Sequence, residues 1–144
     1  MGPEEIARLS AEAMWERDNA ARSLGMVIVE IGPGRAVLAM EVQASMINGH
    51  GLCHGCYIFL LADTAFAYAC NSHGARNVAQ YAQIHFLSPG RPDSRLTAEA
   101  IERSRGERSG LTDVTVRDDK GVTIAEFRGA SRRISESPPP APRD

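Results

Sequence analysis

The sequence contains little cysteine, with three residues in a chain of 144. Secreted proteins that depend on disulfides carry many more, usually in even numbers, so we interpret these three as free thiols of a cytoplasmic protein. The first residues are acidic where a signal peptide is basic and then apolar. Ile6 also occupies a position where myristoylation requires Ser or Thr. We expect neither an export signal nor a lipid anchor.

The sequence also lacks a large excess of either positive or negative charge. The chain has 16 Lys and Arg residues against 18 Asp and Glu residues, a net charge of −2. Without an overall basic field, we expect no nucleic-acid partner. Hydrophobic residues make up 43% and charged residues 24%, which is ordinary for a globular protein and argues against a wholly disordered, collagen-like or coiled-coil chain. A chain of this length is expected to fold as one domain.

No hydrophobic run is long enough to predict a membrane span. The most apolar stretch, residues 55–70, has 16 residues and one charged side chain, that of Asp63, whereas a bilayer requires roughly 20 apolar residues. A helix that is apolar on every side is typical of a protein interior. We therefore predict a buried helix, ended by the turn that leads to Gly74.

The segments around this helix predict an antiparallel sheet. Residues 4–21 carry apolar side chains at helical spacing. Strands separated by turn residues are predicted at 26–31, 37–42, 77–87, 95–105, 111–118 and 122–134. Runs of strands around one apolar helix predict the α+β class and a sheet curled around that helix, which is the hotdog fold. The predicted domain covers residues 1–134, and the proline-rich residues 135–144 are predicted to be a disordered tail.

Asp63 is the first candidate functional residue. Burying a carboxylate in an apolar helix costs free energy on the order of several kcal/mol unless the group is paired or faces a wet cavity. It is either a core residue bonded to the backbone, or a catalytic base or nucleophile with a raised pKa that lines a cleft. No Lys or Arg lies nearby in the sequence, which favours the second interpretation.

The loop before the apolar helix is the second candidate. Its glycines, Gly49, Gly51 and Gly55, allow a ligand to approach the backbone closely. The N–H groups at a helix start attract anions and polarised carbonyl oxygens, although a plain turn and cap would have a similar sequence. His54 either stabilises this loop by a hydrogen bond or takes a direct part in catalysis.

Cys53 and Cys56, with His50 close by, raise the alternative of a zinc or redox site. A structural zinc site needs a second ligand pair, and none of the remaining candidates supplies one in motif form: Cys70, His73 and His85. Cys56 also enters the apolar helix, where buried thiols are ordinary. We therefore expect no metal and no cofactor, and we interpret His73 and His85 as structural.

The segment NGHGLCHG followed by LADTAFAYACNSHG resembles the active-site region of the hotdog-fold acyl-CoA thioesterases, most closely the PaaI type of bacterial phenylacetate degradation. The resemblance continues through IHFLSPG and LTAEA and covers roughly residues 26–134. It implies that Asn48, Gly55 and Asp63 act together. The family usually has a second glycine where this chain has Cys56, which places a side chain beside the expected oxyanion position.

The chemistry that this resemblance implies is thioester hydrolysis. The Gly55 N–H would polarise the thioester carbonyl, and Asp63 would either deprotonate a water molecule or attack the carbonyl itself. Asn48 would orient water or the loop, with the Thr64 hydroxyl in support. The implied substrates are phenylacetyl-CoA and its ring-hydroxylated forms. Candidates for holding the CoA phosphates are Arg91, Arg95, Arg132 and Arg133.

Two other functions remain open. A hotdog dehydratase of hydroxyacyl thioesters would need an Asp–His pair, and no His lies one helical turn from Asp63. An acyl-CoA-binding protein without turnover would not need the buried carboxylate.

The spacing of Gly55 and Asp63 predicts an assembly. Eight residues separate them, which is about 12 Å along a helix and too far for both to contact one carbonyl group. We therefore predict that the helices of two chains lie antiparallel, so that each site takes Asp63 from one chain and Asn48 with Gly55 from the other. The result is an isologous homodimer, and we expect two such dimers to form a homotetramer.

Overall fold

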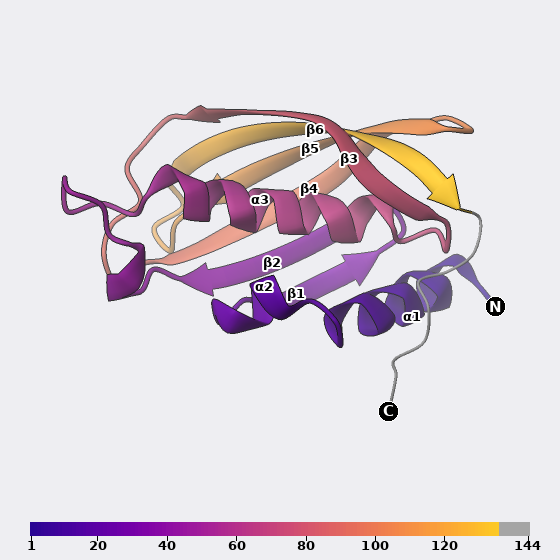
Figure 1. Ribbon diagram of the computed structural model, residues 1–144, viewed down its shortest axis with the longest axis horizontal. Helices are drawn as coiled ribbons and strands as arrows, with labels where there is room; N and C mark the ends of the chain where they lie inside the picture. The colour runs from indigo at the N-terminus through magenta and orange to yellow at the C-terminus, as the bar shows by residue number, and fades with distance from the viewer. Residues whose placement is uncertain (136–144) are drawn as a thin grey trace.

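A six-stranded antiparallel sheet curls around one long helix in the computed structural model, which describes residues 1–135 (Figure 1). The strand order is β1-β2-β4-β5-β6-β3. The elements are α1 (Pro3–Trp15), α2 (Asn19–Ser23), β1 (Val27–Gly32), β2 (Arg35–Glu41), the short 3₁₀ helix η1 (Ala44–Met46), α3 (Gly55–Cys70), β3 (Arg76–Phe86), β4 (Arg95–Arg105), β5 (Ser109–Arg117) and β6 (Thr123–Ser135). The predicted tail lies outside the described residues except for Ser135, which ends β6.

Helix α3 has the predicted bounds and supplies much of the core. Leu61, Phe66 and Tyr68 are at most 1% exposed and belong to the hydrophobic core. The approach is close enough that a Cβ built on Gly129 of β6 would lie 2.8 Å from the Phe66 ring, so only glycine fits there. Burial of such side chains contributes roughly 1.5–3 kcal/mol each.

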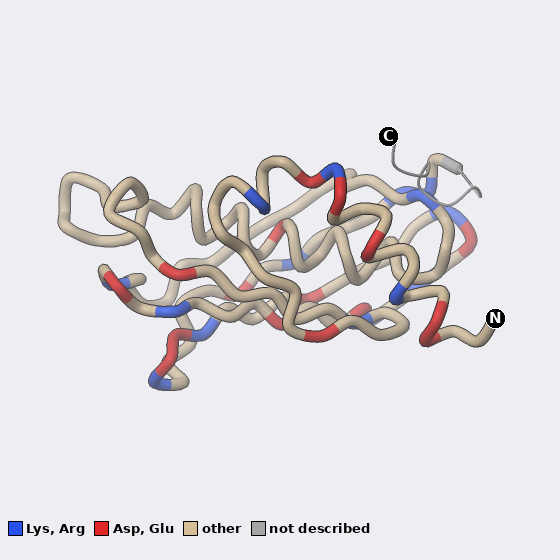
Figure 2. Tube along the Cα trace, turned by 90° about the horizontal axis from the view of Figure 1, so that it is seen from below, with Lys and Arg blue, Asp and Glu red and all other residues tan. Residues whose placement is uncertain are grey.

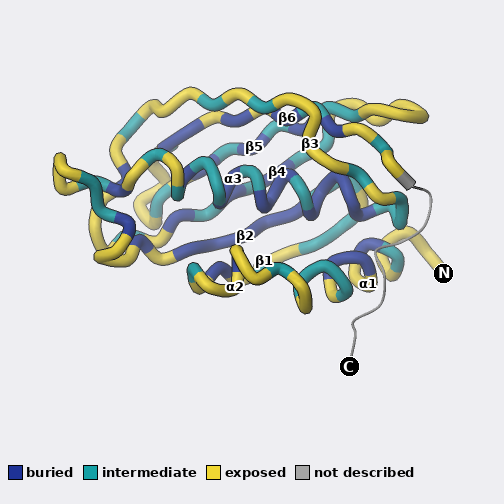
Figure 3. Tube along the Cα trace, viewed as in Figure 1, coloured by how far each residue is buried: buried dark blue, intermediate teal, exposed yellow. Residues whose placement is uncertain are grey.

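Burial on every side of α3 is not observed within one chain. Cys56 is exposed, and Leu60, Asp63 and Ala67 are only half-buried. Their spacing places them on one side of the helix, which we call the outward face of α3. Figure 3 shows half-buried turns of α3 among the buried ones, and β3 beside them is largely exposed. The interpretation of Cys56 as a buried thiol is therefore wrong, because its position belongs to this face.

The N-terminal helix predicted at residues 4–21 is two helices instead. The chain leaves the helix at residues 16–18, where the Asp18 carboxylate accepts a hydrogen bond from the Ala21 N–H (3.1 Å) and caps α2. Asp18 also accepts a hydrogen bond from the Tyr68 hydroxyl of α3 (3.1 Å). The helix cap and the tertiary contact that Asp18 forms therefore divide the segment into two helices, although its apolar residues keep helical spacing.

Strand β3 forms one edge of the sheet. It pairs only with β6 among the described strands, whereas α1 packs against β1 at the opposite edge. Val78 and Tyr81 of β3 are 46% and 62% exposed. An exposed edge strand with apolar side chains is a surface on which another chain can pair.

Candidate active site

The loop before α3 is anchored on both sides. The His54 N–H donates to the Met46 carbonyl of η1 (2.8 Å), and the Cys53 N–H donates to the Gly90 carbonyl in the β3–β4 loop (2.8 Å). His54 is the N-cap of α3, and its Nδ1 accepts a hydrogen bond from the Cys56 N–H (3.0 Å). The loop-stabilising role predicted for His54 is thus present in the structure.

Asn48 shapes the same loop. Its side-chain oxygen accepts hydrogen bonds from the His50 N–H (2.9 Å) and the Leu52 N–H (3.2 Å). Its amide NH₂ group donates to no residue within 1–135. That group can therefore donate to a water molecule or to a substrate.

Gly55 is the first residue of α3 and is half-buried. The first N–H groups of a helix have no partner inside the helix. The ring of Phe86, at the end of β3, lies directly against this glycine, because a Cβ built there would be 3.0 Å from the ring carbon Cζ. The helix start therefore presents the Gly55 N–H beside the Phe86 ring.

Asp63 lies on the outward face of α3 and is half-buried. No residue in the described part of the chain donates a hydrogen bond to its carboxylate or forms an ion pair with it. Burial raises the pKa of Asp63 above its usual range. Within residues 1–135, no hydrogen bond or ion pair compensates the cost of burying this carboxylate.

Thr64 follows Asp63 but bonds to its own helix. Its buried hydroxyl donates to the Leu60 carbonyl (2.6 Å), a contact one turn back along α3. It therefore supports the helical turn that carries Asp63, rather than donating to the carboxylate.

The four candidate arginines form two pairs in one chain. Arg91 lies in the β3–β4 loop and Arg95 begins β4, at the end of the sheet where α3 begins (Figure 1). Arg132 and Arg133 are paired with Val78 and Asn77 near the start of β3, at the end of the sheet where α3 stops. Figure 2 shows basic and acidic residues interspersed along the trace.

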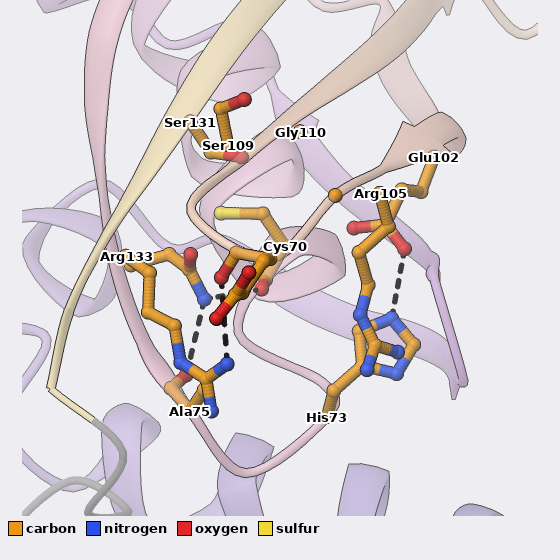
Figure 4. Close-up of a pocket in the computed structure, with 12 residues that line it drawn as sticks. Cys70, His73, Ala75, Glu102, Arg105, Ser109, Gly110, Ser131 and Arg133 are labelled. Atoms are coloured by element: carbon orange, nitrogen blue, oxygen red, sulfur yellow. Dashed lines mark hydrogen bonds and ion pairs between the residues drawn. The ribbon is translucent and has the colours of Figure 1, made fainter.

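A cavity of about 50 Å³ lies at the end of the sheet where α3 stops (Figure 4). Cys70, Arg105 and Arg133 line it, together with His73 and Glu102, whose side chains are 2.8 Å apart. This hydrogen bond ties the turn after α3 to β4, as the structural interpretation of His73 requires. No sequence pattern predicted the contact between Glu102 and His73, because 29 residues separate them.

Alkylation tests the burial of Cys70. Cys53 and Cys70 are buried; burial raises the pKa of Cys53, and burial and the nearby Glu102 raise the pKa of Cys70 to about 12. We expect iodoacetamide at pH 8 to label Cys70 about 10³-fold more slowly in the folded than in the denatured protein, because the thiolate is the reacting species. Peptide mass spectrometry over time gives both rates. Equal labelling of Cys70 in the two states would contradict its burial.

Among residues 1–135, the structure gathers no group of three or more His, Cys, Asp or Glu side chains that could hold a metal ion.

Comparison with known proteins decides the family. The family model described as the thioesterase superfamily matches residues 50–125. The acyl-coenzyme A thioesterase PaaI of Escherichia coli (strain K12) is 47% identical over 125 residues, which cover 87% of this chain and 89% of that relative. The chain belongs to the thioesterase superfamily. The enzyme class that the sequence predicted is thereby confirmed.

Solved structures of thioesterase relatives confirm the hotdog fold and the resemblance to the PaaI type. The E. coli PaaI protein, from the phenylacetic acid degradation operon, superposes with a TM-score of 0.92 at 45% identity, covering 93% of this chain and 97% of that one. A mutant of the phenylacetic acid degradation protein PaaI from Thermus thermophilus gives a TM-score of 0.78 at 33% identity, covering 81% of this chain and 100% of that one.

Proposed function

We propose that this thioesterase hydrolyses acyl-CoA thioesters, with phenylacetyl-CoA and its ring-hydroxylated forms as substrates and the free acid and CoA as products. The observation that carries the proposal is Asp63, a half-buried carboxylate without a partner in residues 1–135, on the helix that begins at Gly55. The names of the E. coli relatives support the choice of acyl-CoA and of the phenylacetyl group.

The proposed chemistry uses a backbone donor and a carboxylate. The Gly55 N–H donates to the thioester oxygen and stabilises the negative charge that develops on it. Asp63 then removes a proton from water, whose oxygen adds to the carbonyl carbon, and the CoA thiolate leaves and takes up the proton. Alternatively, Asp63 adds to the carbonyl carbon, expels the CoA thiolate and forms a mixed anhydride that water hydrolyses. The Asn48 NH₂ group is available to hold the water in either case.

His54 and Thr64 take supporting parts in this proposal. As the N-cap of α3, His54 fixes the first turn and hence the direction of the Gly55 N–H. Thr64 holds the turn before it through the Leu60 carbonyl. Neither is required to exchange a proton with the substrate.

The proposed site is shared between two chains. Gly55 and Asp63 are about 12 Å apart along α3, so one chain cannot bring both to a single carbonyl group. The outward face of α3 and the edge strand β3 carry exposed or half-buried apolar side chains, among them Leu60, Val78 and Tyr81, that a second copy of the chain would cover. Antiparallel packing of two α3 helices produces a homodimer with two identical sites, and we expect such dimers to pair into a tetramer in the cytoplasm.

Within residues 1–135, no helix combines the length and the apolarity that a membrane span requires.

The same packing brings the four arginines together. If Asp63 lies opposite the partner's Gly55, α3 continues for seven residues to Cys70, about 10 Å further. There it reaches the end of the sheet that carries Arg132 and Arg133, and the partner's β3–β4 loop, with its own Arg91 and Arg95, comes to that same end. We propose that this combined basic surface holds the CoA phosphates.

Release of free thiol from a panel of acyl-CoA substrates tests the proposed function. We expect release from phenylacetyl-CoA with stoichiometric formation of the acid. Formation of an enoyl-CoA from a hydroxyacyl-CoA without thiol release would instead indicate the dehydratase. Tight binding of acyl-CoA with no change in it would indicate a binding protein, and either result would overturn the proposal.

Removal of metal is expected to leave thiol release unchanged. The proposed groups are a backbone N–H and a carboxylate, and neither needs an ion to act. Overnight treatment with EDTA followed by the thiol assay measures this, with elemental analysis of the untreated protein as the control. Stoichiometric zinc together with loss of activity would contradict the mechanism and restore the site formed by Cys53 and Cys56.

A further inference from the structure

Phe86 is an aromatic residue at the proposed site that the mechanism does not use. Its side chain is 53% exposed although it lies against the α3 start. From the Cβ position of Gly55, the ring atoms Cζ, Cε1 and Cε2 lie at 3.0, 3.2 and 3.5 Å. One end of the ring therefore contacts the glycine, and the rest is available to a ligand.

The ring is held in place by the backbone around it. Phe86 pairs with Ala125 of β6. Directly after it, the N–H groups of Leu87 and Ser88 both donate to the Ile124 carbonyl, at 2.8 and 3.2 Å. The loop beyond is joined to the loop before α3 through the bond from the Cys53 N–H to the Gly90 carbonyl. Exposure of Phe86 therefore does not come from a loose segment.

We infer that Phe86 forms a wall of the acyl-binding site and determines the preference of the enzyme for large acyl groups; this rests on the proposed function. A thioester oxygen bound by the Gly55 N–H lies about 2.9 Å from the nitrogen, and that nitrogen is two bonds from the Cβ position that the ring lies against. The acyl chain attached to the carbonyl must then pass close to the ring. An acetyl group is too short to cover the ring, whereas a phenylacetyl or hexanoyl group can lie against it.

Aromatic packing makes the preference largest for an aryl group. Two rings in an offset or edge arrangement gain free energy beyond the burial of their area, and a single apolar contact of this kind changes discrimination between substrates roughly 10- to 200-fold. Gly55 is also needed for this position of the ring, because a side chain at residue 55 would displace it. Sequence patterns could not reveal Phe86, since it meets Gly55 only in the folded chain.

The test compares kcat/KM for phenylacetyl-CoA, hexanoyl-CoA and acetyl-CoA in Phe86→Ala and Phe86→Leu. The matched control is Leu87→Ala, since Leu87 is next in sequence and 58% exposed, whereas the atoms nearest to the Cβ position of Gly55 all belong to Phe86. For Phe86→Ala we expect a loss of about 10-fold or more with phenylacetyl-CoA, a smaller loss with hexanoyl-CoA and about 2-fold or less with acetyl-CoA. Phe86→Leu is expected to retain more activity on hexanoyl-CoA than on phenylacetyl-CoA.

The ratio between substrates separates this role from a structural one. A variant that has only loosened the loop or weakened the dimer loses activity on all three substrates alike, and that result would overturn the inference. An unchanged ratio in Phe86→Ala would overturn it as well, and so would an equal change in Leu87→Ala. If the unmodified enzyme releases no thiol from any of the three substrates, the proposed function fails instead.

Discussion

Replacing Asp63 by asparagine is expected to lower thiol release roughly 10²- to 10⁴-fold, the usual contribution of a general base. The amide has almost the same size and shape as the carboxylate, so the outward face of α3 keeps its packing. It can neither take a proton from water nor form an anhydride. Rates of thiol release from phenylacetyl-CoA, measured with saturating substrate, provide the number.

Folding of the Asp63→Asn variant is the control for this loss. Burial raises the pKa of Asp63 in the folded chain, so the folded state binds the proton more tightly than the unfolded state does. The stability that protonation contributes is lost as the pH rises through the folded pKa. At pH 7 the carboxylate therefore destabilises the fold, and we expect the amide to raise Tm, by about 2–4 °C for each kcal/mol regained.

The pH profile of the unmodified enzyme reports the same group. Only the deprotonated carboxylate acts as base or nucleophile, so kcat/KM should fall as the pH drops through the raised pKa of Asp63. If Asp63→Asn kept more than about a tenth of the activity, which is far more than the loss of a base would leave, Asp63 would be structural. A fall in Tm would show that the carboxylate makes a stabilising contact.

Mixing two inactive variants is expected to restore about a quarter of the activity. An Asp63→Ala chain and an Asn48→Ala chain, refolded together in equal amounts, form mixed dimers as about half of all dimers. In each mixed dimer one site inherits both defects, and the other combines an intact Asp63 with an intact Asn48. Each variant alone is expected to be nearly inactive, because every site of its homodimer has one defect.

Native mass spectrometry confirms the mixed dimers when one variant is labelled uniformly with heavy nitrogen, because the two substitutions change the chain mass almost equally. Thiol release gives the restored activity. Because Asn48 also holds its loop through the His50 and Leu52 N–H groups, the circular dichroism and Tm of Asn48→Ala must match those of the unmodified protein. Activity that stays at the level of the separate variants, with mixed dimers present, would show that each site lies within one chain. A monomeric protein with full activity would contradict the shared site directly.

Hydrophobic patterns and turn residues in the sequence predicted the long helix and the strands correctly. Helix α3 and strand β4 have the predicted bounds, and the remaining strands differ at their ends by a residue or two. An apolar run bounded by turn residues constrains the chain irrespective of its partners. The predicted N-terminal helix was too long because the contact between Asp18 and Tyr68 joins residues 50 positions apart, which no local pattern contains.

For the site, the sequence by itself determined which residue types could act and where they stand along the chain. A lone carboxylate in an apolar helix and a glycine at its start were visible as departures from the hydrophobic pattern, and their spacing on one helix excluded a common target within one chain.

Tertiary structure alone decided how these groups are surrounded. Among residues 1–135, it left Asp63 without a partner on the outward face of α3, separated the four arginines into two pairs and set Phe86 against Gly55. The reason is that burial, pairing and contact depend on the path of the strands, which brings distant residues together. Spacing along the sequence is set by covalent geometry, whereas the environment of a side chain is set by what packs around it.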